Sequence, residues 1–233
     1  MNETIAGTLR RAAGTRGRRI LLAVTIGIGV LAAALMTGLP SAERTFAAFA
    51  EQVQLLISVP LPFIGVLLAN DLRKTPGVRV QPTLAGAVLI AVAAGVAGNV
   101  LVVAALAASG STAPDPWAHA GVIGLTGVLV QVLAQLVGTG LGLLIKRPVW
   151  GCLGTIVLPL GAYALLAPLG AVRDWLTPYA AAQHLLTGSA GAAEWARWAT
   201  VALLWGIALN TIGAVVLRRR AARVAPQKAN LQR

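Results

Sequence analysis

The sequence predicts an all-α integral membrane protein that crosses the bilayer six times. Only 11% of the 233 residues are charged and 57% are hydrophobic, whereas soluble domains usually carry about 25% charged residues. Six apolar runs reach the roughly 20 residues that a membrane-spanning helix needs. These runs are residues 20–38, 46–69, 84–108, 118–145, 152–170 and 198–217.

The basic residues predict the orientation of the chain. The formal net charge of +12 would suggest nucleic-acid binding in a soluble protein. Here the cations lie between the apolar runs, so we expect contact with membrane lipid and no nucleic acid. Lysine and arginine accumulate on the cytoplasmic side of membrane proteins, and only Arg44, Arg173 and Arg197 lie in the gaps that would face the other side. Both termini are therefore predicted to be cytoplasmic.

Residues 1–19 form a predicted cytoplasmic segment ahead of the first span. Ile5, Leu9 and Ala12 recur at the spacing of one helix face, which favours a short amphipathic helix on the inner membrane surface. The apolar run at 20–38 is longer than the apolar core of a signal peptide, and no convincing small-residue cleavage site follows it. We interpret it as a retained first span.

The gap between the second and third runs is a short charged joint, NDLRKTPGVRVQPT at residues 70–83. Its prolines Pro76 and Pro82 prevent one continuous helix, because proline lacks a backbone N–H and restricts the residue before it. Two interpretations of its charges stand side by side. The joint is either a basic anchor at the lipid headgroups or a docking element for a cytoplasmic partner.

The connection between the fifth and sixth runs is unusually apolar for a loop. Residues 171–197 include LTPYAAAQHLL, a GSAG break and all but the last residue of AAEWARW, which predicts short helices that are interfacial or re-entrant. An aromatic belt at the membrane surface explains the tryptophans equally well. After the sixth run, residues 218–233 form a predicted basic cytoplasmic tail.

The sequence carries no catalytic constellation, so we expect that the chain is not an enzyme. It contains neither H-E-x-x-H nor G-x-S-x-G, and its histidines His119 and His184 lie outside the cores of the runs. A Walker A loop requires a lysine preceded by glycine, and none of the three lysines follows a glycine. No cofactor is expected in this chain, and any nucleotide-driven work would need a partner that binds ATP.

A few polar residues interrupt the apolar runs and are candidates for a translocation pathway. They are Glu51, Gln54, Asn99, Gln131, Gln135 and Asn210. Gln131 and Gln135 are one helical turn apart and share a face. Such residues either hydrogen-bond to neighbouring helices or line a polar path. The runs also contain pairs of small residues four apart, such as Gly138 with Gly142, which favour close helix packing.

The layout resembles that of the ABC type-2 exporter permeases across most of the chain. The basic N-terminal segment corresponds to the connecting helix of that family, and NDLRKTPGVRVQPT occupies the place of its coupling helix. LTPYAAAQHLLTGSAGAAEWARW stands where the family has re-entrant helices, and the basic ending LRRRAAR also fits. The joint departs from the family pattern, because only Asp71 and Gly77 stand where an acidic, glycine-containing run is common.

The resemblance implies a permease subunit in the bacterial cytoplasmic (inner) membrane. A second copy or a paralogue would complete the pathway, and separate ATP-binding subunits would hold ATP and Mg²⁺. The residues implied in coupling to those subunits are Asp71, Arg73, Lys74, Arg79, Arg10 and Arg11. The alternative is a secondary transporter or a non-catalytic membrane assembly or regulatory subunit. Ion-coupled carriers usually place ionisable groups at the membrane midplane, and the sequence favours the first interpretation because its runs have none there unless Glu51 lies deep.

Overall fold

The computed structural model describes residues 4–74, 79–188 and 190–230 of the chain. Every regular element within these ranges is a helix, and six helical stretches are long and apolar enough to cross a membrane. The prediction of an all-helical chain with six potential spans is therefore confirmed. Pro76 and Gly77 of the joint and residues 231–233 of the tail lie outside the described ranges.

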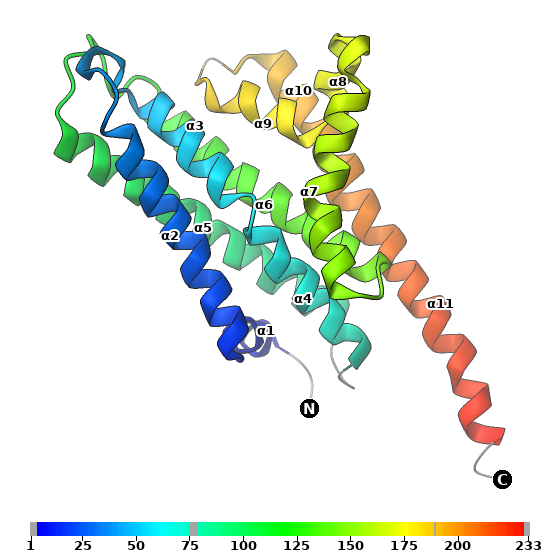
Figure 1. The fold of residues 1–233 in the computed structure, drawn as a ribbon. Coiled ribbons are helices and arrows are strands. Elements are labelled where there is room, and N and C mark those ends of the chain that lie inside the picture. Colours follow the sequence, from blue (N-terminus) through cyan, green and yellow to red (C-terminus); the bar gives the residue numbers. More distant parts are fainter. Residues whose placement is uncertain (1–3, 75–78, 189, 231–233) are drawn as a thin grey trace.

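Helices of very different length make up the fold (Figure 1). In chain order they are α1 (Ile5–Ala12), α2 (Arg16–Met36), η1 (Ser41–Glu43), α3 (Phe46–Ile57), α4 (Leu61–Lys74), α5 (Val80–Ser109), α6 (Ala120–Leu144), α7 (Pro148–Leu165), η2 (Ala167–Leu169), α8 (Ala171–Leu176), α9 (Pro178–Leu186), α10 (Ala192–Val201), η3 (Ala202–Ala208) and α11 (Leu209–Asn230). The second candidate span comprises α3 and α4, and the sixth comprises α10, the π-helical η3 and the first half of α11.

A short helix, α1, precedes the first span. Of the apolar face expected from the sequence, Ala12 is buried, whereas Ile5 and Leu9 are exposed. The first turn of α1 is capped by Thr4, whose hydroxyl oxygen accepts a hydrogen bond from the backbone N–H of Gly7 at 3.2 Å. The buried face of α1 contains Thr8 and Ala12 and packs against α5 and α4. This helix therefore lies against the bundle and is not an isolated arm.

The second span is interrupted between α3 and α4, a break that the hydropathy of the sequence does not show. Residues 58–60 leave the α-helical pattern, and Pro60 has no N–H to offer the ladder of helical hydrogen bonds. The span resumes at Leu61. The interruption leaves room beside it for an apolar cavity.

The connection between the fifth and sixth spans contains the helices that the sequence predicted, but with a different division. α9 packs against α6, α10, α3 and α7, and its buried face includes Ala181 and Leu185. The sixth span begins at Ala192 and not at Trp198, because α10 runs into η3 and α11 without interruption. The carboxylate of Glu194 caps this start by accepting a hydrogen bond from the N–H of Gly191 at 2.9 Å.

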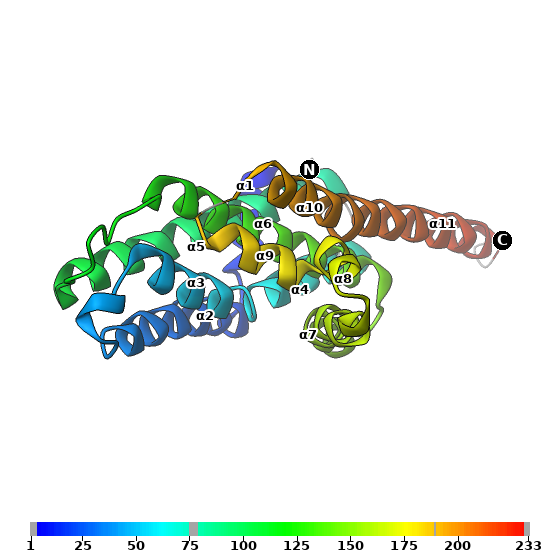
Figure 2. The ribbon, with the colours of Figure 1, turned by 90° about the horizontal axis from the view of Figure 1, so that it is seen from above.

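Helix α6 is the centre of the bundle (Figures 1 and 2). It packs against α3, α4, α5, α7, α9 and α11. The closest approach is to α4, where an added Cβ at Gly138 would overlap the carbonyl oxygen of Pro62. An added Cβ at Gly142 would lie 2.8 Å from both Val66 and Ala69. The small pair seen in the sequence is thus the contact surface between α4 and α6.

We expect Gly138→Ala to destabilise the protein by about 1–3 kcal/mol, because the new methyl group meets backbone atoms that cannot move aside. Gly27→Ala is the matched control, since an added Cβ there meets nothing within 4 Å and alanine favours a helix over glycine. Thermal unfolding of both variants in detergent measures the difference. Equal midpoints for the two variants would contradict the tight α4–α6 contact.

Candidate functional site

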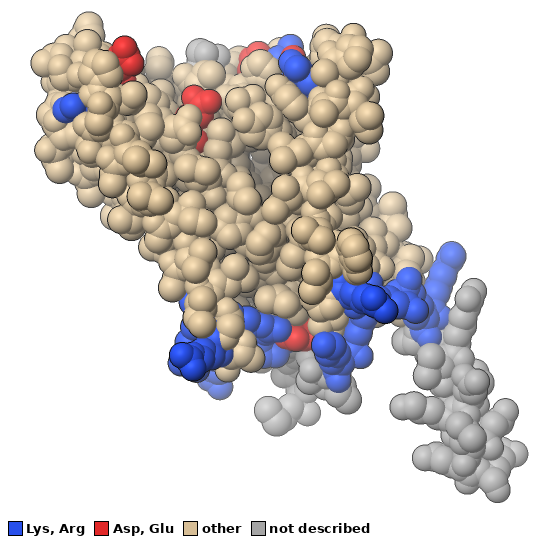
Figure 3. All heavy atoms as spheres, in the orientation of Figure 1, with Lys and Arg blue, Asp and Glu red and all other residues tan. Residues whose placement is uncertain are grey.

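The two ends of the bundle differ sharply in charge (Figure 3). One end carries α1, the start of α2, the joint and the α6–α7 connection, and the basic residues gather there. The basic residues of these segments, and of α11 as far as Arg220, are Arg10, Arg11, Arg16, Arg18, Arg19, Arg73, Lys74, Arg79, Lys146, Arg147, Arg218, Arg219 and Arg220. Asp71 is the one carboxylate on these segments within the described residues. We call this surface the basic end.

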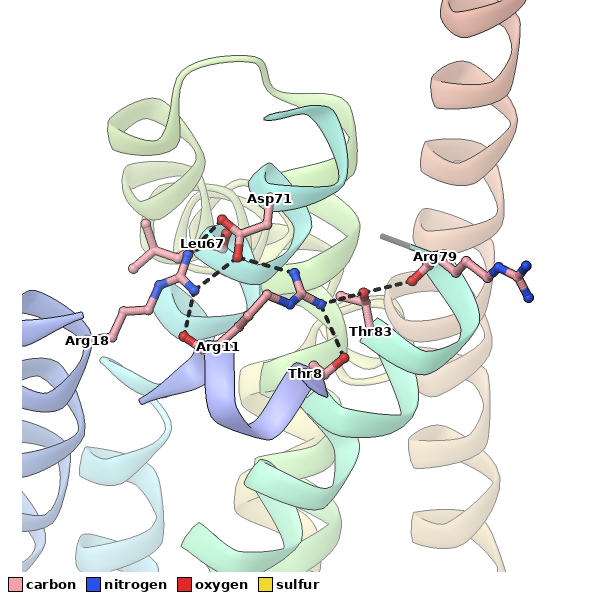
Figure 4. A network of polar contacts seen from close by, with 7 residues as sticks. All are labelled: Thr8, Arg11, Arg18, Leu67, Asp71, Arg79 and Thr83. Carbon is pink, nitrogen blue, oxygen red and sulfur yellow. Dashed lines mark hydrogen bonds and ion pairs between the residues drawn. The ribbon is translucent and has the colours of Figure 1, made fainter. Parts of the chain in front are cut away.

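Asp71, in the last turn of α4, joins two arginines from different helices (Figure 4). Its Oδ1 accepts a hydrogen bond from Nη2 of Arg18 at 2.8 Å, and its Oδ2 accepts one from Nη1 of Arg18 at 2.9 Å. Oδ2 also lies 3.3 Å from Nη1 of Arg11. The side chain of Asp71 is 17% exposed and that of Arg18 is 12% exposed, so water screens this pair less than it would a surface pair.

The two arginines extend these contacts to further helices. Arg11 donates from Nη2 to the hydroxyl oxygens of Thr8 and Thr83, at 3.2 and 3.4 Å. Arg18 donates to the carbonyl oxygen of Arg11 at 2.8 Å and to that of Leu67 at 3.2 Å. We call Thr8, Arg11, Arg18, Asp71 and Thr83 the Asp71 network. It ties α1, α2, α4 and α5 together at the basic end.

Arg73 is also used within the chain. Its guanidinium donates from Nη1 to the carbonyl oxygen of Ile145 at 2.6 Å and from Nη2 to that of Leu143. These carbonyls lie at the C-terminus of α6, where the last turn of a helix leaves its oxygens without partners. Arg73 therefore caps α6 and fixes the end of α4 against it.

The six residues expected to couple to a partner thus divide into two sets. Asp71, Arg11 and Arg73 are partly buried and bonded to other parts of the chain. Arg10, Lys74 and Arg79 are exposed. The sequence reasoning missed Arg18, because nothing local distinguishes it from Arg16 and Arg19. The only signal in the sequence was that Asp71 is one carboxylate among many cations, so an arginine would be expected to pair with it.

A second polar cluster lies inside the bundle, between α3, α5 and α6. The amide nitrogen of Gln54 donates to Oδ1 of Asn99 at 2.8 Å and to the carbonyl oxygen of Gly95 at 3.0 Å. Asn99 donates to the carbonyl oxygen of Gly124 at 2.9 Å. Gln131 donates to Oε1 of Gln54 at 2.9 Å. Three of the polar candidates therefore meet and bridge helices.

Glycines on both neighbouring helices make room for Gln54, which is completely buried. An added Cβ at Gly98 of α5 or at Gly127 of α6 would lie 2.9 Å from its amide group. A larger residue at either position would displace the amide from its partners. Gly98 thus accommodates a side chain and not a helix backbone.

The other polar candidates lie apart from this cluster. Oδ1 of Asn210 accepts a hydrogen bond from the hydroxyl of Thr139 at 2.8 Å, and its nitrogen donates to the carbonyl oxygen of Leu136 at 2.7 Å. Gln135 is completely buried, and neither of its amide atoms has a hydrogen-bond partner among the described residues. Glu51 lies partly exposed on α3. Sharing a helix face did not bring Gln131 and Gln135 to a common partner.

An apolar cavity of about 160 Å³ lies beside the break in the second span. The α3–α4 break, α6, α7 and α9 line it, and its lining residues include Ser58, Pro62, Ala134, Thr155, Pro159 and Tyr179. Its walls suit an apolar group. Within the described ranges, no three His, Cys, Asp or Glu side chains lie together as a metal ion would need.

Helix length, composition and charge distribution define the class of this chain, a multi-pass helical membrane protein. Comparison with protein-family models, with curated proteins and with solved structures found no match to it.

We expect Asp71→Asn to lower the free energy of unfolding by about 2 kcal/mol, because two arginines lose their charged acceptor. Hydrogen exchange should accelerate in Ile5–Ala12, the helix that Arg11 anchors. Asp115→Asn is the control, since Asp115 is exposed and an exposed carboxylate contributes little to stability. Unchanged exchange of α1 in Asp71→Asn would contradict the anchoring role.

Gln131 and Gln135 offer a second matched pair, one helical turn apart. Gln131→Leu should cost about 1–3 kcal/mol, because it leaves the amide oxygen of Gln54 without its donor. Gln135→Leu should be neutral or stabilising, since the amide that it removes has no partner. Thermal unfolding midpoints measure both, and a larger loss in Gln135→Leu would contradict these assignments.

Proposed function

We propose that this chain is the transmembrane permease subunit of an ATP-driven ABC exporter in the bacterial cytoplasmic membrane. It works with a second copy or a paralogue, and separate subunits bind ATP and Mg²⁺ at the basic end. The basic end is the cytoplasmic face in this proposal, as the distribution of lysine and arginine favours.

The observation that carries the proposal is the attachment of two peripheral segments to three spans at one point. α1 and the α4 end of the joint are the segments that an ATP-binding subunit would push, and the Asp71 network bonds them to α2, α4 and α5. Arg73 adds a bond to the end of α6. A displacement of either segment is therefore passed to the first four spans together.

The exposed cations supply the docking contacts in this proposal. Arg10 on α1 and Lys74 at the end of α4 are both exposed on the basic end, where acidic groups of an ATP-binding subunit would face them. Opposite charges across an interface raise the association rate and select the partner. Arg73 and Asp71 transmit the motion and do not touch the partner.

The polar groups inside the bundle favour transport that is driven by a separate ATP-binding subunit. The completely buried polar side chains of the described spans are amides and threonine hydroxyls such as Gln54, Gln131 and Thr126, which neither take up nor release a proton near neutral pH. A proton-coupled carrier needs ionisable groups along its path. This favours the permease over the secondary transporter, while an assembly or regulatory subunit remains the alternative if no ATP-binding partner exists.

The cavity beside the α3–α4 break is where we expect the cargo to pass. It lies next to the interrupted span, and its apolar lining suits a hydrophobic part of the cargo. The proposal therefore includes a hydrophobic or amphiphilic cargo.

Purification of the tagged protein from its native membrane in mild detergent, after cross-linking, tests the proposal directly. Mass spectrometry should identify a stoichiometric soluble partner that contains a Walker A loop. Recovery of the chain without such a partner would transfer the assignment to the alternative.

We expect the double variant Arg10→Glu with Lys74→Glu to weaken binding of the ATP-binding subunit by at least about tenfold, because like charges would then face each other. Lys146→Glu with Arg147→Glu is the matched control, with the same charge change on exposed residues of the α6–α7 connection. Co-purification and stimulation of ATPase activity measure the effect in membrane-inserted protein. Equal losses in both double variants would show that only the overall charge matters and would contradict docking at α1 and the joint.

A further inference from the structure

A groove runs between α5 and α11 on the surface of α6. Both helices pack on α6 and stand apart from each other above it, which leaves a depression of about 350 Å³. Leu84 of α5 forms one wall, Leu136 of α6 lies on the floor, and η3 with α11 forms the other wall. The main lining residues are Leu84, Leu136, Ile207, Ala214, Val215 and Arg218.

The groove is apolar along its length and cationic at one end. Two polar residues line it, but their groups are bonded within the protein. The hydroxyl of Thr211 donates to the carbonyl oxygen of Ile207 at 2.8 Å, and Asn210 is bonded to Thr139 and Leu136. From Asn210 to Arg218 the helix rises about 12 Å, so hydrocarbon surface leads directly to a guanidinium at the basic end.

The charge of Arg218 is not balanced within the described part of the chain. Arg218 is exposed, and the described salt bridges do not include it. Asp71, the carboxylate of the basic end, is already shared by Arg11 and Arg18. Arg220, on the same helix, lies close enough to Arg73 for the two positive charges to repel each other. This corner of the molecule therefore favours an anion from outside.

We propose that the groove between α5 and α11 is a binding site for one anionic phospholipid. One acyl chain lies along Leu84, Leu136 and Ala214, and the phosphate accepts hydrogen bonds from Arg218. A guanidinium suits this task because its planar fork matches the oxygens of a phosphate. Anionic lipids are enriched in the cytoplasmic leaflet, where each nearby basic residue strengthens their attraction.

An anionic phospholipid fits because the site combines an apolar groove with a cationic end. An apolar groove within the candidate span, facing outward beside exposed residues such as Ile207 and Ile212, meets lipid chains at high local concentration. The cation at its end selects a negatively charged headgroup from that supply. The inference does not use the proposed exporter function; it takes from that proposal only the assignment of the basic end to the cytoplasmic face.

Native mass spectrometry of the full-length protein tests the proposal with phosphatidylglycerol and phosphatidylcholine that carry identical oleoyl chains. We expect the wild-type protein to retain phosphatidylglycerol about tenfold better, as one charge-assisted contact would provide. Arg218→Gln should abolish that preference. Arg219→Gln is the matched control: it removes the same charge one residue further along, from a position outside the groove lining, and should keep the preference.

A second pair of measurements distinguishes a site that binds a whole phospholipid from one that binds only an anion. Ala214→Phe should fill the groove and lower retention of both lipids, while inorganic phosphate should not raise the unfolding temperature of the wild-type protein as phosphatidylglycerol does. Equal preference in Arg218→Gln and Arg219→Gln, equal retention of the two lipids by the wild-type protein, or full stabilisation by inorganic phosphate would each overturn the proposal.

Discussion

The close contact between α4 and α6 is the constraint on which the rest of the structure depends. In lipid, the hydrocarbon around a helix is as apolar as another helix, so association relies on packing and hydrogen bonds. Gly138 and Gly142 bring the backbone of α6 against Pro62 and Val66. The other spans are then placed relative to this pair, through Gln131 on one side of α6 and Leu136 and Thr139 on another.

The same contact determines how charge is arranged at the basic end. Because α4 is held on α6, its last turn is held as well, and Arg73 caps α6 while Asp71 faces α1 and α2. One carboxylate thereby organises two of the many arginines at this end. The remaining exposed cations, such as Lys74 and Arg218, stay available, and the two proposals assign them to a protein partner and to a lipid headgroup.

Hydropathy predicted the number of spans well, since a run of about 20 apolar residues is a local property. It missed the break at Pro60, because the residues around this proline are as apolar as a continuous helix would be. It also placed the start of the sixth span too late, because Glu194 and Arg197 reduce the hydropathy of a turn that the helix nevertheless includes. Asp71 was a candidate because it lies in the joint that the family resemblance marks, whereas its partner Arg18 was not named.

The sequence by itself determined the helical class, the six apolar stretches and the segregation of basic residues into particular connections. These depend on composition within windows of the chain. Only the tertiary structure decided which arginines turn inward, that Gln54 meets Asn99 and Gln131, and that Gln135 meets none of them. Such pairings depend on the rotation and depth of each helix against its neighbours. Those quantities are set by contacts between residues far apart in the sequence, above all where a glycine lets two backbones approach.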